Sequence, residues 1–211
     1  MRFVLFLTLA LTGCTSLYYN AMEKIGKEKR DILVQRLIAG KKDQEKAKEQ
    51  IKTTLEAFQD LTGFDGGNLE KTYKKLNGEF EDAEKRANDV SERIKSIDQV
   101  GNDLFKEWNQ ELGTINDTTL HNRSAALLRQ TRTRHQQYVQ RMKQTERKML
   151  PVLQGFRDQV LYLKHNLNAA AIGSLKSTAA KMDTDVSLLI ADMEGSSKEA
   201  DSFIQSLTTQ P

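Results

Sequence analysis

Cysteine, proline and aromatic residues are scarce in this chain of 211 residues, and each shortage excludes a class of fold. The only cysteine is Cys14, so residues 15–211 contain no disulfide framework. The only prolines are Pro151 and Pro211, and aromatic residues make up 7% of the chain against 29% for charged ones. Few chain breakers together with many charges are typical of long helices rather than of a compact mixed fold.

An excess of charge of one sign is missing as well. The chain has 32 lysines and arginines against 29 aspartates and glutamates, a formal net charge of +3. A balance this close to neutral argues against a general binder of polyanions. Tyr138 is the only Phe, Tyr or Trp residue among the arginines of residues 123–148, whereas proteins that bind single-stranded nucleic acid interleave several aromatic residues with basic ones. We therefore expect no nucleic-acid partner.

The first fourteen residues have the form of a lipoprotein signal. Arg2 supplies a positive charge, and residues 3–11 form an apolar run that is too short to span a bilayer as a mature helix. The run leads into Leu-Thr-Gly-Cys, which resembles the lipoprotein cleavage site, where the cysteine becomes residue one and carries a diacylglycerol and an N-acyl chain. We expect residues 1–13 to be removed and residues 14–16 to form a lipidated tether, with Cys14 as the anchor, because two or three acyl chains hold a protein durably in a membrane.

Apolar residues recur at alternating steps of four and three along four long stretches of the chain. This spacing predicts amphipathic helices packed at a shallow left-handed crossing, whereas a strand would need alternation with period two. The expected helices cover about 17–61, 69–112, 119–166 and 172–207. The most regular stripe, in which Gly101 is the one position without a side chain, is formed by Leu69, Tyr73, Leu76, Phe80, Ala83, Ala87, Val90, Ile94, Ile97, Leu104 and Trp108.

Breaks between the helices follow local chemistry. Glycines in residues 63–67 supply the geometry that ends a helix, and Asn68 is suited to cap the next one. Residues 116–118 give polar turn and cap chemistry for the following break. Pro151 removes an amide donor and is expected to kink the third helix or shift its stripe by one residue. The weak stripe at residues 40–43 is expected to face the surface.

The connection between the last two helices has two possible forms. No proline or glycine pair separates them, so one long helix is possible, and a hairpin near residue 168 is the alternative. A hairpin would give helices of similar length, as an up-down-up-down bundle requires. It would also lay the basic run 123–148 beside the acidic run 183–201 and neutralise both. Charge therefore favours the hairpin.

These patterns predict an all-α fold, an elongated antiparallel helical bundle or coiled coil with three to four long helices after a cleaved signal peptide. Residues 17–211 are expected to form a single domain. An apolar stripe serves packing within one chain and between chains alike, so a homo-oligomer stays open.

The basic run 123–148 is the candidate binding surface. The basic run either contacts anionic lipid or envelope glycan, or it is a solvated helix face whose charges pair with the acidic run. The candidate residues are Arg129, Arg132, Arg134, Arg141 and Arg147.

Catalytic and metal-binding patterns are missing from the sequence. The three histidines, His121, His135 and His165, are too far apart to share a helical metal site, and His135 lies on the apolar stripe. No phosphate loop, nucleophile elbow or Cys/His pair is present. We expect no enzymatic activity and no cofactor beyond the lipid on Cys14.

Three segments resemble a family of uncharacterised proteobacterial lipoproteins that is classed as a domain of unknown function. They are residues 14–33 (CTSLYYNAMEKIGKEKRDIL), 161–169 (LYLKHNLNA) and 185–194 (DVSLLIADME). The resemblance implies a mostly helical protein of the Gram-negative envelope and carries no catalytic residue. Thr15 follows the lipidated cysteine, where the enterobacterial sorting rule requires aspartate for retention in the inner membrane, so threonine implies delivery to the outer membrane.

The sequence therefore predicts a non-catalytic lipoprotein on the periplasmic face of the outer membrane. It would act as a helical scaffold or interaction protein for an envelope partner. A binding module that uses the basic run on anionic lipid or glycan is the alternative.

Overall fold

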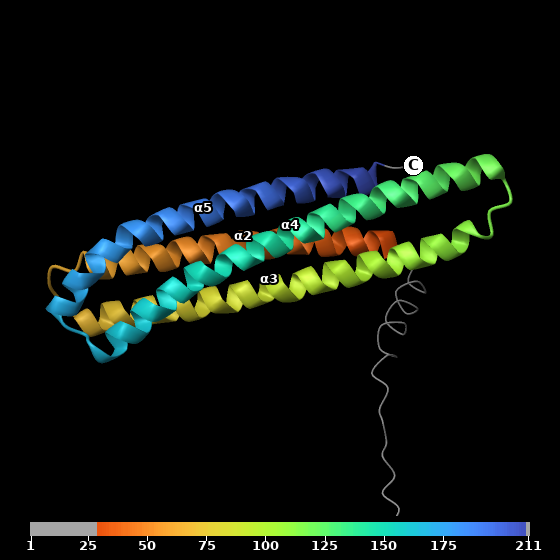
Figure 1. The fold of residues 1–211 in the computed structure, drawn as a ribbon. Coiled ribbons are helices and arrows are strands. Elements are labelled where there is room, and N and C mark those ends of the chain that lie inside the picture. Colours follow the sequence, from red (N-terminus) through yellow and green to blue (C-terminus); the bar gives the residue numbers. More distant parts are fainter. Residues whose placement is uncertain (1–28, 210–211) are drawn as a thin grey trace, which may run out of the picture.

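The computed structural model describes residues 29–209, which form four long helices joined by three short turns (Figure 1). The predicted Cys14 anchor and the start of the first expected helix lie outside the described residues. The helices are α2 (Lys29–Thr62), α3 (Leu69–Leu112), α4 (Thr118–His165) and α5 (Ala169–Thr208).

The four helices form an antiparallel bundle in which α2 contacts α3 and α5, and α4 contacts α3 and α5. The all-α bundle expected from the sequence is confirmed. The α2–α3 and α4–α5 turns lie at one end of the bundle, and the α3–α4 turn lies at the other, together with the start of α2 and the end of α5 (Figure 1). At 1.5 Å per residue the 48 residues of α4 span about 72 Å, so the bundle is a rod.

The core of the bundle follows the predicted stripes. Three polar positions on the α4 stripe, Thr131, His135 and Thr145, are buried as well. The stripe shifts by one residue after Pro151, which lies inside α4, because Val152 and Leu153 are both buried. The α4 core consists of Leu128, Tyr138, Val139, Met142, Met149, Val152, Leu153, Phe156, Val160 and Leu163.

The hairpin between α4 and α5 is the form that the chain adopts. Asn168 begins α5, and its side chain accepts a hydrogen bond from the amide of Ala171 at 3.0 Å. The acidic run then lies beside the basic run, and the Arg141 guanidinium is 3.4 Å from the carboxylate of Asp192. Arg141 and Lys148 of the basic run therefore pair with the acidic run across the fold-back, which confirms the predicted neutralisation in part.

The expectation that residues 40–43 face the surface is wrong for Gly40, which is buried. A side-chain carbon added to Gly40 would lie 2.8 Å from Ile97 Cδ1, so the Ile97 side chain would have to shift to admit a larger residue. One turn later the buried Gln44 amide donates to Ser196 Oγ at 3.1 Å. The stripe looked weak in the sequence because glycine and glutamine fill two core positions of α2.

No described helix carries an apolar stretch of the length and purity needed to cross a bilayer.

Candidate functional site

The two ends of the rod differ in how completely the helices cover one another. At the end that holds the α3–α4 turn, α3 and α4 continue past the start of α2 and the last turn of α5 (Figure 1). There Lys29, the first described residue of α2, pairs with Glu107, five residues before the last residue of α3. Among the described residues, 29–209, α2 and α5 therefore do not cover the protruding part of the α3–α4 hairpin.

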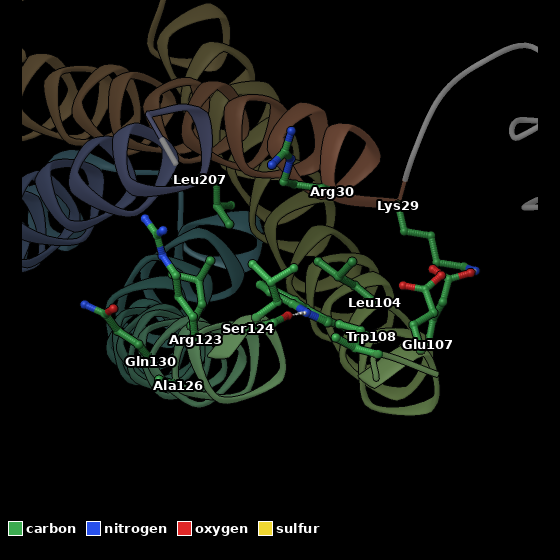
Figure 2. Close-up of a pocket in the computed structure, with 14 residues that line it drawn as sticks. Lys29, Arg30, Leu104, Glu107, Trp108, Arg123, Ser124, Ala126, Gln130 and Leu207 are labelled. Carbon is green, nitrogen blue, oxygen red and sulfur yellow. Dashed lines mark hydrogen bonds and ion pairs between the residues drawn. The ribbon is translucent and has the colours of Figure 1, made fainter. Parts of the chain in front are cut away.

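A groove of about 1000 Å³ lies at this place and is shown in Figure 2. We call it the open-end groove. Its floor is largely apolar, formed by Leu104, Trp108, Ile115, Leu120, Ala126, Leu127 and Leu207, and its polar lining residues are Lys29, Arg30, Glu107, Glu111, Arg123, Ser124 and Gln130. The exposed fraction of Leu120 is 58%, so an apolar side chain here faces solvent instead of a packing partner.

The hairpin that carries the groove is held in place by local hydrogen bonds. Asp117 caps α4, because its carboxylate accepts from the amides of Thr119 and Leu120 at 2.8 and 2.9 Å. The indole of Trp108 on α3 donates to Ser124 Oγ on α4 at 2.8 Å (Figure 2). These bonds tie the end of α3 to the start of α4 and fix the first turn of α4.

The rim of the groove carries both signs of charge. Lys29 Nζ lies 2.5 Å from Glu107 Oε1, and Glu111 follows one turn further along α3. Arg30 and Arg123 lie on the rim as well. Such a lining suits an apolar segment that itself carries charges of both signs.

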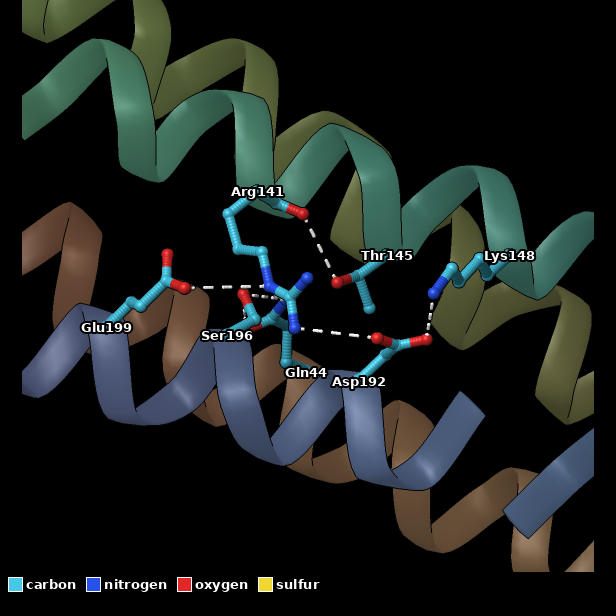
Figure 3. Close-up of polar contacts among 7 residues, drawn as sticks. All are labelled: Gln44, Arg141, Thr145, Lys148, Asp192, Ser196 and Glu199. Carbon is cyan, nitrogen blue, oxygen red and sulfur yellow. Dashed lines mark hydrogen bonds and ion pairs between the residues drawn. The ribbon is translucent and has the colours of Figure 1, made fainter. Parts of the chain in front are cut away.

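The five candidate arginines of the basic run do not share one face. Arg141 points towards α5, where it lies 3.4 Å from Asp192 and 3.7 Å from Glu199 (Figure 3). Arg132 points towards α3, with its guanidinium over the Phe105 ring. Arg129, Arg134 and Arg147 are exposed, and none of them makes an ion pair within residues 29–209.

The opposite end of the rod also exposes apolar side chains. Leu161 and Tyr162, in the last turn of α4, have exposed fractions of 52% and 43%. Both lie close to the α4–α5 turn. The bundle therefore offers apolar side chains at both ends.

The remaining candidate residues are distributed as follows. Cys14 and Thr15 lie outside the described residues. His135 is buried, and since a carbonyl only accepts, its Nε2–H donates to Ile97 O at 3.2 Å. Burial lowers the pKa of His135, which keeps the ring neutral. Within residues 29–209 no group of three or more His, Cys, Asp or Glu side chains is placed to hold a metal ion.

The open-end groove was missed at the level of sequence, although part of its signal was present. Leu120 and Leu127 are seven residues apart and share a helix face, and that face lies beside the stripe that begins at Leu128. A second apolar face next to the main stripe indicates a further packing partner. The location of the groove could not be read from the sequence, because it depends on how α2 and α5 are placed along α4.

Comparison with family models finds a match to a family described as a protein of unknown function (DUF2959), over residues 18–207. The match confirms the resemblance to a family of unknown function that was noted in the sequence. Neither the curated proteins nor the solved structures give a match to this chain.

Proposed function

The chain belongs to this family of unknown function, and we propose that it serves as a non-catalytic scaffold lipoprotein on the periplasmic face of the outer membrane. In this proposal a lipid on Cys14 holds one end of the rod at the membrane. The rod then projects towards an envelope partner.

The observation that carries the proposal is that one particular end of the rod lies close to Cys14 along the chain. Lys29, the first described residue of α2, lies at the end with the open-end groove, and Cys14 precedes Lys29 by fifteen residues. Even when fully extended, fifteen residues reach only about 50 Å. A lipid on Cys14 therefore keeps the groove end near the membrane and leaves the end with Leu161 and Tyr162 as the distal one.

A scaffold also needs to be rigid, and ion pairs between helices support the rigidity of this bundle. Lys41 on α2 lies 2.7 Å from Asp201 on α5, and Arg93 on α3 lies 2.9 Å from Asp43 on α2. Each pair alone contributes little in water, about 1 kcal/mol or less. Their placement across helix boundaries favours one register of the bundle over its alternatives.

Substitutions at Cys14 and Thr15 test the proposed location of the protein in the outer membrane. We expect Cys14→Ser to abolish labelling with radioactive palmitate and to remove the protein from the outer-membrane fraction. Thr15→Asp is expected to keep the label and move the protein to the inner-membrane fraction, and Thr15→Ser serves as the control that leaves the location unchanged. Unchanged fractionation of Cys14→Ser would contradict the proposal.

The scaffold role has its own test, with a photo-crosslinking amino acid at position 162 in growing cells. We expect a discrete adduct with one envelope protein, and we expect it to disappear in the Cys14→Ser chain, which is no longer held at the membrane. Leu188, exposed by 64% on α5, is the matched control position, where no such adduct is expected. Equal adducts at both positions, or none at 162, would argue against a distal contact surface.

Binding of anionic lipid or glycan is the second candidate function, because three exposed arginines of α4 have no acidic partner within the described residues. Each basic residue near an anionic surface contributes about 1 kcal/mol. Arg129→Glu with Arg147→Glu should therefore weaken binding of the Cys14→Ser chain to phosphatidylglycerol vesicles by more than about tenfold. The control reverses Lys85 and Lys106, two exposed lysines of α3. An equal loss of vesicle binding in both double variants would show that net charge alone causes the effect, and that the arginines of α4 form no binding surface.

A further inference from the structure

We infer that His135 is an acid-sensitive switch in the bundle. With a neutral ring it joins α3, α4 and α5 to one another, and protonation of the ring loosens α3 from α4 beneath the open-end groove. The inference goes beyond the proposed function, because it concerns the bundle alone and holds with or without a lipid on Cys14.

The ring of His135 on α4 contacts both helices that neighbour α4. Its Nε2–H donates to the carbonyl of Ile97 on α3 at 3.2 Å. The ring also meets Phe105 of α3 and Phe203 of α5 edge-on, at centroid distances of 5.2 and 6.2 Å. The exposed fraction of His135 is only 1%, so one buried side chain joins three helices at this level of the rod.

The site leaves no room beside Nε2 and gives Nδ1 no hydrogen-bond acceptor. The ring fills the space where a side chain at residue 101 would lie, because a carbon added to Gly101 would be 2.1 Å from Nε2. Within residues 29–209 the hydrogen bond to Ile97 is the only one that the ring makes. Protonation of Nδ1 would therefore bury a charged donor without a partner, which destabilises the folded state.

The charged groups near the ring also disfavour a positive charge. The guanidinium of Arg132 lies over the Phe105 ring, 5.5 Å from its centroid, and an imidazolium would bring a second, repelling cation to the same ring. Asp98 of α3 and Lys143 of α4 are the charged residues that act on His135. They pair with each other at 2.9 Å, so the carboxylate of Asp98 is already neutralised. Among the described residues, α2 and α5 add no charged group that acts on the ring.

The direction of the pH effect follows from burial. Burial lowers the pKa of His135 below its ordinary value of 6.5, so the unfolded chain binds this proton more tightly than the folded one. The stabilisation is therefore complete above about pH 6.5 and is lost as the pH falls towards the pKa of the folded state. His165 is exposed and His121 only half-buried, so His135 alone among the histidines belongs to the core.

The switch lies next to the open-end groove. Phe105 follows Leu104, which lines the groove, and Trp108 of the same lining lies one turn further along α3. Loss of the contact between His135 and Phe105 therefore loosens α3 from α4 below the groove. Phe156, which packs on Phe58, lies about 31 Å further along α4, so we expect the centre of the rod there to stay intact.

Urea unfolding of the Cys14→Ser chain at about pH 7.5 and about pH 5 tests the switch. We expect acidification to raise the unfolding equilibrium constant at least about fivefold more in this parent chain than in its His135→Gln variant, whose amide keeps a donor for Ile97 O but does not titrate. His121→Gln is the matched control and should keep the full pH dependence. Equal pH dependence of the parent chain and His135→Gln would overturn the inference, and so would a loss of pH dependence in His121→Gln.

The only tryptophan, Trp108, gives a local measurement on the parent chain that needs no change at His135. Its indole donates to Ser124 Oγ across the boundary between α3 and α4. We expect acrylamide quenching of its fluorescence to rise about twofold between the two pH values while the helical circular dichroism signal is retained, and His121→Gln to show the same rise. Three results would overturn the inference: quenching that does not change with pH, quenching that rises only when the helical signal is lost, and a rise that disappears in His121→Gln.

Discussion

Replacing Gly101 by alanine is expected to destabilise the bundle by about 2–4 kcal/mol, although alanine is the better helix former. A side-chain carbon at Gly101 would lie 2.1 Å from His135 Nε2 and within 2.6 Å of two further ring atoms. The ring cannot move away freely. It donates to Ile97 O and packs edge-on against Phe105, with ring centroids 5.2 Å apart. Displacing it costs both the buried hydrogen bond and the ring packing.

Thermal and urea unfolding followed by circular dichroism measure this effect. For a chain of this size the loss corresponds to a fall in Tm of about 5–15 °C. Gly78→Ala on the same helix is the matched control, because nothing lies within 4 Å of the added carbon there. That variant should gain up to about 1 kcal/mol from helix propensity alone. A Gly101→Ala chain as stable as Gly78→Ala would contradict the packing seen between α3 and α4.

A double variant separates the clash from other causes. His135→Ala empties the space that the added carbon needs, so Gly101→Ala should be far less damaging in a His135→Ala chain than in the native one. The two changes are expected to couple by about 1–3 kcal/mol, as residues in direct contact do. Strict additivity would mean that Gly101 and His135 do not face one another.

The complementarity of Gly101 and His135 also marks the limit of the sequence analysis. Both residues were recognised as unusual members of an apolar stripe, one on α3 and one on α4. Their pairing depends on the relative register of two helices, which a stripe on either helix does not contain. Gly40 was misplaced for the same reason: its burial comes from Ile97 on another helix.

Features that depend on a single helix or on charge were predicted more accurately than contacts that depend on the register between helices. The breaks near Asn68 and Asp117 were predicted from cap chemistry, and both side chains accept amide hydrogen bonds at the start of their helices. The cap that Asn168 provides for α5 was not predicted. The hairpin between α4 and α5 was favoured by matched helix lengths and by charge, and Arg141 and Asp192 pair across it. The open-end groove was not predicted, because its lining comes from α2, α3, α4 and α5 together, and no single stripe contains their relative positions.

Replacing Phe156 by alanine is the second change for which we expect a large loss, about 3–5 kcal/mol. Phe156 is fully buried, and its ring meets that of Phe58 edge-on at a centroid distance of 6.3 Å. Phe58 belongs to α2 and Phe156 to α4, two helices that lie diagonally across the bundle. The pair therefore fills the centre of the rod, where no neighbouring helix can collapse into the space that alanine leaves.

Urea unfolding of Phe156→Ala, with Leu161→Ala as the control, measures this loss. Leu161 lies on the same helix but is 52% exposed, so its truncation should change the free energy of unfolding by about 0.5 kcal/mol or less. Phe58→Ala should cost a similar amount to Phe156→Ala, and the double variant should cost less than the sum, because the first truncation already removes the ring contact. A loss below about 1 kcal/mol for Phe156→Ala would mean that the centre of the rod repacks. The diagonal contact would then not hold α2 against α4, and the rigidity required of a scaffold would have to come from the ion pairs between neighbouring helices.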